Sequence, residues 1–68
     1  MNMIPLASIQ RISKKAGVQR ISAKALKELQ NALEDIGIEI ARDAAELARH
    51  AHRKTMLKED ILLASKKM

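Results

Sequence analysis

The densest group of chemically active side chains lies in the stretch ARHAHRKTMLKED, residues 48–60. It holds two histidines, four Lys or Arg, one threonine and two acids, a combination that is usual at catalytic or metal sites. Two histidines among basic residues, without a cysteine, make a poor zinc set, and no serine or cysteine lies in a nucleophile motif. We therefore expect no enzyme, no metal and no cofactor, and another role must explain the stretch.

The length and composition limit the class of protein. The chain has 68 residues, and we expect a single domain over residues 1–68. With no cysteine there are no disulfides, so a chain this short is expected to need a partner to bury enough surface. The absence of Phe, Trp and Tyr argues against proteins that stack RNA or single-stranded bases on aromatic rings. No long apolar run or signal-peptide pattern occurs, so we expect a soluble, intracellular protein.

Charge is segregated along the chain instead of being spread evenly. Residues 1–27 contain six bases and no acid, residues 28–46 contain six acids and one base, and residues 47–68 contain six bases and two acids. A fold that brings the two basic blocks to one surface would suit a polyanion such as a nucleic acid. The alternative from charge alone is a solvated basic surface without a specific partner.

Apolar residues recur at spacings of three and four along most of the chain, which predicts three helices. The expected helical ranges are about 6–16, 22–50 and 57–67. Pro5 suits the start of the first helix, and Gly17 suits the position just past its end. Ser22 is a residue type that caps helix N-termini, and it precedes the second helix. The sequence therefore predicts an all-α chain with the order short, long, short.

The long second helix makes the strongest demand on the fold. Its roughly 29 residues span about 43 Å at 1.5 Å per residue, which two flanking helices of about 15 Å each cannot cover. A monomer would leave a long apolar strip in water, so we expect an antiparallel dimer in which two long helices cross near their middles. Gly37 lies inside this helix, either as a tolerated weak spot or as the place where another backbone comes close.

Three segments carry a resemblance to a known family: AGVQRIS, EIARDAAELARHA and RKTMLKEDI. Together with the helix order they make the chain similar to the archaeal-type histones, which are minimal histone folds without tails, over about residues 4–67. The resemblance implies an all-α histone fold that forms an antiparallel handshake dimer. It also implies binding of double-stranded DNA with little sequence preference, bending, wrapping or compaction of that DNA, and a cytoplasmic location on the chromosome or nucleoid.

The resemblance assigns DNA contacts to five residues. It implies that Arg20 enters the minor groove, where a narrow groove concentrates negative potential that attracts an arginine. Lys54 and Thr55 would hold phosphates, and Arg11 and Lys14 would add phosphate contacts where the first helices of two chains meet. Such contacts position a protein on DNA without reading its sequence. The alternatives are a surface charge that serves solubility for Arg20 and a helix cap for Thr55.

Five residues match positions to which the family gives a structural role. The resemblance implies an intrachain salt bridge between Arg53 and Asp60 that braces the connector before the third helix. It also implies a contact between dimers made by Leu47, His50, Asp60 and Leu63, in which the histidine bonds the aspartate of another chain. The alternative for His50 is a plain surface histidine. A tetramer or larger multimer on DNA is therefore expected beyond the homodimer.

The chain departs from the family's pattern at two positions of the second connector. His52 stands where glycine is usual, which we expect to alter the end of the long helix or to add a polar contact. Leu57 replaces a residue that is frequently basic, which weakens the phosphate-binding surface. Gly17, where adjacent turns of a wrapped fibre are expected to pack closely, is retained.

An alternative function belongs to another class of protein. A histone-fold chain can serve as a heterodimerisation module of a transcription assembly instead of binding DNA by itself. The self-sufficient basic blocks argue against this alternative, but the sequence leaves open whether a second histone partner exists. We expect neither a membrane nor a small-molecule substrate among the partners.

Overall fold

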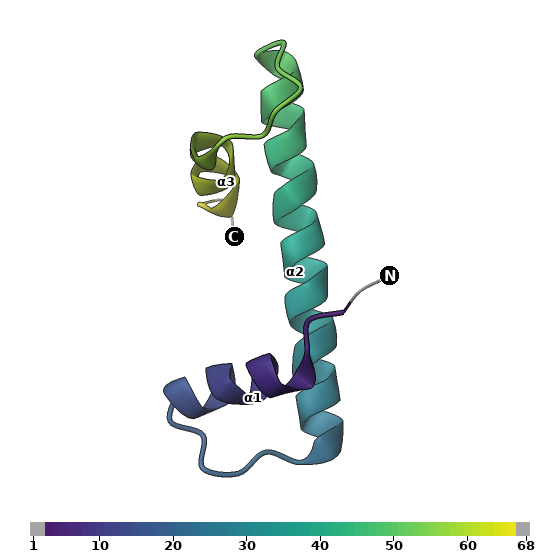
Figure 1. Ribbon diagram of the computed structural model, residues 1–68, viewed down its shortest axis with the longest axis vertical. Coiled ribbons are helices and arrows are strands. Elements are labelled where there is room, and N and C mark those ends of the chain that lie inside the picture. The colour runs from purple at the N-terminus through teal and green to yellow at the C-terminus, as the bar shows by residue number, and fades with distance from the viewer. Residues whose placement is uncertain (1–2, 67–68) are drawn as a thin grey trace. The chain divides into compact units, whose positions relative to one another are not determined.

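The computed structural model describes residues 3–66, and this part of the chain forms three helices and no strand (Figure 1). The helices are α1 (Leu6–Lys15), α2 (Ala23–His50) and α3 (Lys58–Ser65). Their lengths of 10, 28 and 8 residues correspond to about 15, 42 and 12 Å. The expected all-α order of a short, a long and a short helix is therefore confirmed.

Two helix ends, Leu6 and His50, match the expected ranges, and the other four differ by one or two residues, because capping residues lie next to the helical ones. Ala16 is the C-cap of α1 and Leu57 the N-cap of α3. Ser22 precedes α2, and its Oγ accepts a hydrogen bond from the backbone N–H of Ala25 at 3.0 Å. Lys67, the expected end of the third helix, lies outside the described residues.

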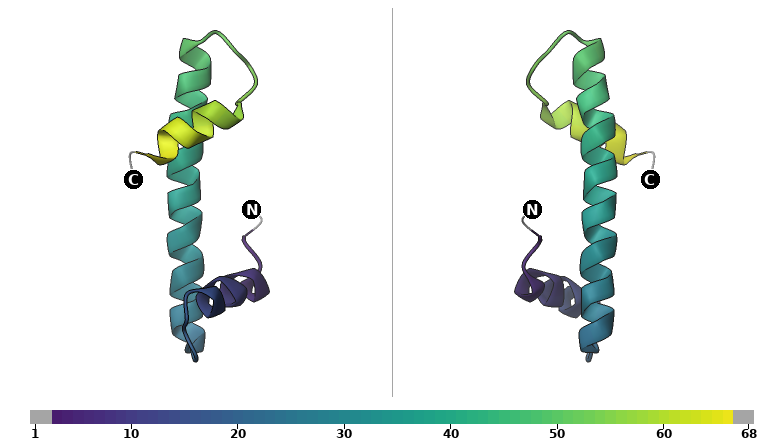
Figure 2. Two further views of the ribbon diagram at one scale, coloured as in Figure 1. Left: turned by 90° about the vertical axis from the view of Figure 1, so that its left-hand side faces the viewer. Right: turned by 90° about the vertical axis from the view of Figure 1, so that its right-hand side faces the viewer.

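The chain forms two compact units, and the boundary between them falls inside α2, between Asp35 and Ile36. In the N-terminal unit α1 lies against the first half of α2, and in the C-terminal unit α3 lies against the second half (Figures 1 and 2). None of the described helices combines the length and the apolar character that a membrane-spanning segment needs.

The N-terminal unit is held together by one apolar side chain and a polar clamp. Ile9 is the largest side chain that is completely buried in the described part of the chain. Gln30 of α2 donates through Nε2 to the carbonyl oxygen of Ile4 at 2.6 Å, and the N–H of Ile4 donates to Oε1 of Glu34 at 2.5 Å. Because the backbone N–H and carbonyl of Ile4 both bond to side chains of α2, the segment that precedes α1 is held against that helix.

The C-terminal unit packs through small residues. Ala44 and Ala48 of α2 and Ala64 of α3 are buried, which allows the two helices to approach closely. Asp60 is also buried, with an exposed fraction of 5%. The close approach of α3 to the alanine-rich half of α2 therefore brings a carboxylate into the interior of this unit.

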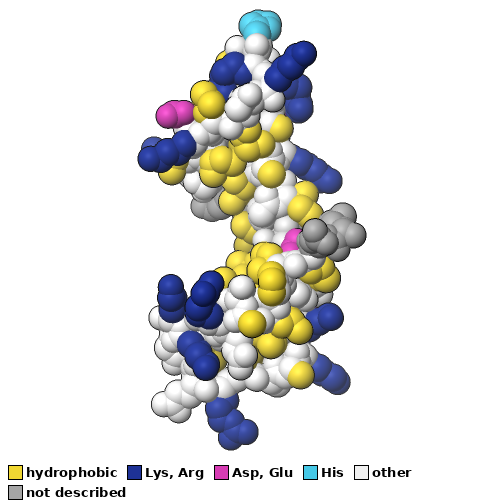
Figure 3. All heavy atoms as spheres, viewed as in Figure 1, with side chains coloured by type: hydrophobic (Ala, Val, Ile, Leu, Met, Phe, Trp, Pro, Cys, Tyr) yellow, Lys and Arg dark blue, Asp and Glu magenta, His cyan; other side chains and the backbone are white. Residues whose placement is uncertain are grey.

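Neither unit buries its apolar residues alone. Within residues 3–66, eleven large hydrophobic side chains are at least 37% exposed. They are Met3, Leu6, Ile12, Val18, Ile36, Ile38, Met56, Leu57, Ile61, Leu62 and Leu63. Figure 3 shows such side chains in yellow on the face drawn, in both units. Surface of this kind is usually covered by a partner, since water-exposed apolar area is unfavourable.

Candidate nucleic-acid interface

The first connector, residues 16–22, begins with a Schellman motif that ends α1. The N–H of Gly17 donates to the carbonyl of Lys14 and the N–H of Val18 donates to the carbonyl of Ser13, each at 3.0 Å. Gly17 has a φ of 90°, in the left-handed region that favours glycine. The motif satisfies the last carbonyls of α1 and turns the chain past the end of that helix.

A recess of about 250 Å³ lies between the last turns of α1 and the first connector. Its polar lining residues are Gln10, Ser13, Lys14, Gln19 and Arg20. Lys14 and Arg20, two of the expected DNA contacts, are thus brought to one place, and no carboxylate of residues 3–66 lines the recess. On the face drawn in Figure 3, Lys and Arg side chains gather at this end of α1 without Asp or Glu among them. Arg11 is exposed on α1 but does not line the recess.

Gln10 and Gln19 were not identified from the sequence as site residues. A signal for Gln10 was present, because residues four apart share one side of a helix and Gln10 lies four residues before Lys14. Gln19 adjoins Arg20 in the connector, but nothing in the sequence shows that the connector folds back toward α1. Its place in the recess follows from the Schellman turn.

The second connector, residues 51–57, begins with the same motif. The N–H of His52 donates to the carbonyl of Arg49, and the N–H of Arg53 donates to the carbonyl of Ala48, each at 2.9 Å. His52 has a φ of 59°, although it is not glycine. A side chain in this region costs roughly 1–2 kcal/mol. The departure from the family's glycine therefore leaves the course of the chain intact but strains it at this residue.

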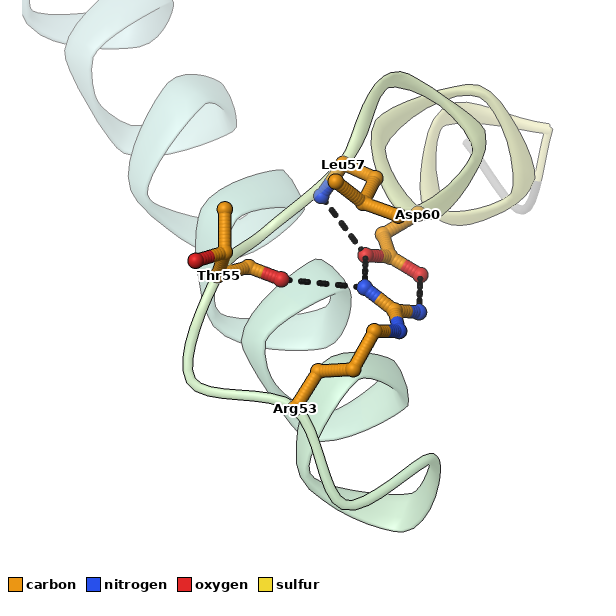
Figure 4. A network of polar contacts seen from close by, with 4 residues as sticks. All are labelled: Arg53, Thr55, Leu57 and Asp60. Atoms are coloured by element: carbon orange, nitrogen blue, oxygen red, sulfur yellow. Dashed lines mark hydrogen bonds and ion pairs between the residues drawn. The ribbon is translucent and has the colours of Figure 1, made fainter.

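Arg53 of the second connector and Asp60 of α3 form a two-pronged ion pair (Figure 4). Nη1 and Nη2 of Arg53 each lie 2.9 Å from one carboxylate oxygen of Asp60. Nη1 also donates to the carbonyl of Thr55 at 2.9 Å. The backbone N–H of Leu57 donates to Oδ2 of the same aspartate at 2.8 Å. One carboxylate thus ties the connector to the first turn of α3.

Each member of this pair shifts the pKa of the other in the direction that favours its charged form. The hydrogen bonds from Arg53, followed by the bond from the Leu57 N–H, lower the pKa of Asp60 from 3.8 to about 2. The hydrogen bond to Asp60 raises the pKa of Arg53 in turn. Both groups are therefore charged at neutral pH, and the arginine is engaged in holding the loop.

Lys54 and Thr55 lie in the same connector but face solvent. Both residues are exposed, and the guanidinium of Arg53 uses only the backbone carbonyl of Thr55. The N-cap of α3 is Leu57, so the alternative in which Thr55 caps that helix is wrong. The side chains of Lys54 and Thr55 remain available for an external contact.

The residues expected between dimers lie near the end of α2 and on α3. Leu63 is exposed and Leu47 is half-buried. Nε2 of His50 lies 3.7 Å from Oε1 of Glu46, whose pKa is lowered by a hydrogen bond from Arg49. Within the chain His50 does not meet Asp60, so their expected contact would have to form between chains.

The described residues offer no metal site. No three His, Cys, Asp or Glu side chains within residues 3–66 lie close enough together to hold an ion. The two histidines instead occupy a helix end and a strained turn. The dense stretch is therefore divided among bracing, solvent-facing and helix-ending roles.

Comparison with known proteins places these features in a family. The family described as histone-like transcription factor (CBF/NF-Y) and archaeal histone matches residues 2–64. A subunit of the archaeal histone HAN1 from Thermococcus zilligii is 47% identical over 66 residues, covering 97% of this chain and 98% of the relative. Probable archaeal histone 3 of Methanocaldococcus jannaschii is 50% identical over 64 residues, covering 94% and 96%. Histone H4 of Encephalitozoon cuniculi is 38% identical over 61 residues, covering 90% and 59%.

These matches confirm the resemblance on which the histone fold was expected. They also confirm that the chain is not an enzyme, because the relatives that match nearly its whole length are named as histones. The three helices, in the order short, long and short, agree with this assignment. The chain belongs to the family of histone-like transcription factors and archaeal histones.

Proposed function

We propose that the chain is a histone that binds double-stranded DNA without sequence preference and bends, wraps or compacts it. The observation that carries this proposal is the meeting of Lys14 and Arg20 at a recess that no carboxylate of residues 3–66 lines, in a member of the histone family. Neutralising phosphates with such cations releases condensed counterions, which drives binding to any sequence. A location on the chromosome in the cytoplasm follows from this function.

The individual contacts are part of the proposal. Arg20 enters the minor groove, and Arg11, Lys14, Lys54 and Thr55 hold phosphates on either side of it. All five residues are exposed. Within residues 3–66, none of the four cations forms an ion pair with a carboxylate, in contrast to Arg53. Their charge is therefore free for a polyanion.

The chain acts as an antiparallel handshake dimer. The exposed hydrophobic side chains of both units supply the surface that a second copy would cover. Gly37 lies near the middle of α2, and a Cβ added there would meet no atom within 4 Å in the single chain. The open side of this glycine supports a crossing of two long helices at that point, with residues 1–68 acting as one histone-fold domain.

Backbone groups in the two connectors support the same dimer. Within the described residues, the N–H groups of Gln19, Arg20 and Ile21 and those of residues 54–56 make no backbone hydrogen bond. In an antiparallel dimer the first connector of one chain comes beside the second connector of the other. A short parallel bridge between them would pair these groups and hold Arg20 next to Lys54 and Thr55.

A second contact between dimers would use Leu47, His50, Asp60 and Leu63. Leu63 and His50 are exposed, as such a contact requires. Since both oxygens of Asp60 already accept bonds from Arg53, the histidine of another chain would add to an occupied carboxylate. A carboxylate has room for a further donor, because its two oxygens offer about four lone pairs.

Salt-dependent binding to duplex DNA tests the proposal. We expect the affinity for mixed-sequence duplexes to fall steeply between about 50 and 200 mM salt. Arg20→Ala should weaken binding to all sequences alike, whereas Lys27→Ala, which removes an exposed base of α2 with no assigned contact, should change it less. Affinity without salt dependence, or loss of the dimer in Arg20→Ala, would contradict the assignment.

Nuclease protection of long DNA distinguishes the geometries. Inward-facing minor grooves recur about every 10 base pairs in wrapped DNA, so stacked dimers should give a ladder with steps of about 30 base pairs. Isolated dimers that only bend DNA should give a single short footprint instead.

The second candidate is a heterodimerisation module of a transcription assembly. The exposed hydrophobic residues Leu62 and Leu63 of α3 favour it, because they would suit an unlike histone-fold chain as well as an identical one. Tight binding to such a chain, together with no binding to duplex DNA at low salt, would support this candidate over the first.

A further inference from the structure

The recess beside α1 suits a small, polar ligand. Its volume of about 250 Å³ lies below the roughly 300–1,000 Å³ of sites that enclose drug-sized molecules. The sequence contains no Phe, Trp or Tyr, so none of these rings can stack on a nucleobase or on a cofactor ring in the recess. A ligand in this place is therefore recognised by charge and hydrogen bonds.

The electrostatics of the recess favour an anion. Lys14 and Arg20 line it, and none of the described Asp or Glu residues does. The end of a helix normally presents negative carbonyl oxygens. Here the carbonyls of Ile12, Ser13 and Lys14 already accept backbone N–H groups from residues 16–18. The repulsion that bare carbonyls would exert on an anion is thereby reduced.

The neutral donors of the recess are two glutamine side chains. The hydroxyl of Ser13 is buried and donates to the carbonyl of Gln10 at 2.7 Å, so its proton is committed inside the unit. Gln10 and Gln19 are exposed, and each carries an amide NH₂ with two donors. Gln10 lies one turn before Lys14 on the same side of α1, and Gln19 adjoins Arg20 in the connector.

We propose that Gln10 and Gln19 donate side-chain N–H groups to a DNA backbone phosphate that sits in this recess with Lys14. The phosphate flanks the minor groove that Arg20 enters, so this inference rests on the proposed DNA-binding function. Amide side chains contact phosphate oxygens in many protein–DNA interfaces and carry no charge. The recess therefore combines one counterion-releasing contact with two neutral hydrogen bonds.

Measurements of duplex affinity over a range of salt concentrations separate these contributions. Gln10→Ala and Gln19→Ala should each raise Kd roughly 2- to 10-fold per recess, as expected for one neutral hydrogen bond. The slope of log Kd against log salt should stay unchanged, because an amide displaces no counterion. Lys14→Gln should raise Kd and also flatten the slope by about 0.9 per recess. Asn31→Ala removes an exposed amide of α2 outside the recess and should change neither quantity.

The outcomes distinguish the inference from the function on which it rests. If the unmodified chain binds DNA and the variants Gln10→Ala and Gln19→Ala show the same Kd and the same salt slope, the glutamine contacts are overturned. The proposed histone function would be unaffected by that result. Failure of the unmodified chain to bind duplex DNA at low salt would overturn both. A flattened slope in the glutamine variants would also count against the inference, since it would indicate a lost charge contact. Circular dichroism and sizing of each variant establish that it is folded and assembled.

Discussion

The connector after α1 and the connector after α2 start from the same Schellman motif but are held in different ways. Gly17 and His52 occupy the equivalent left-handed positions, at φ values of 90° and 59°. Beyond that residue the first connector has no ion pair within the described residues, whereas the second is tied to α3 through Arg53 and Asp60. The same backbone turn thus leads into an open segment in one case and a braced one in the other.

The difference shows how identical residue types acquire different tasks. Each connector contains an arginine, and both side chains carry a positive charge at neutral pH. Arg53 meets a buried carboxylate and serves the loop, while Arg20 lies at a recess lined by none of the described carboxylates. The charge of an arginine that is already paired is offset by its carboxylate, and several of its N–H donors are occupied. The unpaired arginine is therefore the better candidate for a phosphate-rich partner.

The largest expected effect comes from breaking the brace. Asp60→Asn removes the negative charge that pairs with Arg53 and leaves the guanidinium without an ionic partner. We expect the melting temperature to fall on the order of 10 °C at fixed chain concentration. Glu59→Gln, one residue earlier and exposed, is the matched control and should have little effect. Equal melting temperatures for Asp60→Asn and the control would show that the brace is dispensable.

Acid should loosen the second connector before the first. The pKa of Asp60 is about 2 in the folded chain and 3.8 ordinarily, so its contribution to stability is complete above pH 3.8. That contribution should be lost as the pH falls from about 4 toward 2. Denaturant unfolding across this range should show the decline in the unmodified chain and a smaller one in Asp60→Asn. Identical pH profiles for both chains would contradict the assigned cause.

Exchanging the residues at the left-handed positions tests the shared turn. Gly17→Ala should destabilise the fold by roughly 1–2 kcal/mol, although the space around the glycine is open. His52→Gly should stabilise it by about 0.5–1 kcal/mol, because relief of strain exceeds the entropy cost of glycine. Unfolding by urea measures both changes. A destabilised His52→Gly would mean that the histidine side chain makes a contact worth more than the strain.

The caps at the ends of the connectors differ as well. Ser22 Oγ accepts from the N–H of Ala25, whereas Leu57 offers no side-chain oxygen to α3. Ser22→Ala should therefore cost about 1 kcal/mol. Ser22→Asp, which restores an acceptor, should recover most of that loss in the same unfolding measurement; no difference between the two variants would exclude a capping role.

The smallest effect on stability is expected at Arg20. Arg20→Ala should change the free energy of unfolding by no more than about 0.5 kcal/mol, because the side chain is exposed and has no ion-pair partner in residues 3–66. Arg53→Ala should destabilise the fold strongly. A large loss of stability in Arg20→Ala, measured in the absence of DNA, would contradict the view that only the arginine of the second connector stabilises the fold.

Much of the fold followed from local pattern. Apolar spacing of three and four predicted the helices, and Gly17 and Ser22 indicated two of the ends, because caps act within a few residues of the chain. The pairing of Arg53 with Asp60 was implied only by the family resemblance, and the two side chains do lie in contact. The expected DNA contacts stay predictions, since no nucleic acid is present to test them.

Other features needed the tertiary structure. The clamp on Ile4 joins residues separated by 26 and 30 positions, and nothing local indicates that Gln30 and Glu34 would meet that backbone. The strain at His52 was not predicted either, because an altered helix end or an added polar contact was expected at this position instead of a positive φ. The departure from the family's glycine pointed to the right position without revealing its conformation.

The sequence by itself determined the helix order, the segregation of charge and the family, all of which depend on residue type and short-range spacing. The tertiary structure confirmed the pairing of Arg53 with Asp60 that the resemblance implied, and it alone showed that Gln10 and Gln19 share a recess with Lys14. Those outcomes depend on how each connector turns at the end of its helix and what it then packs against. The difference arises because a periodic pattern is local, whereas a contact between distant residues is chosen by packing.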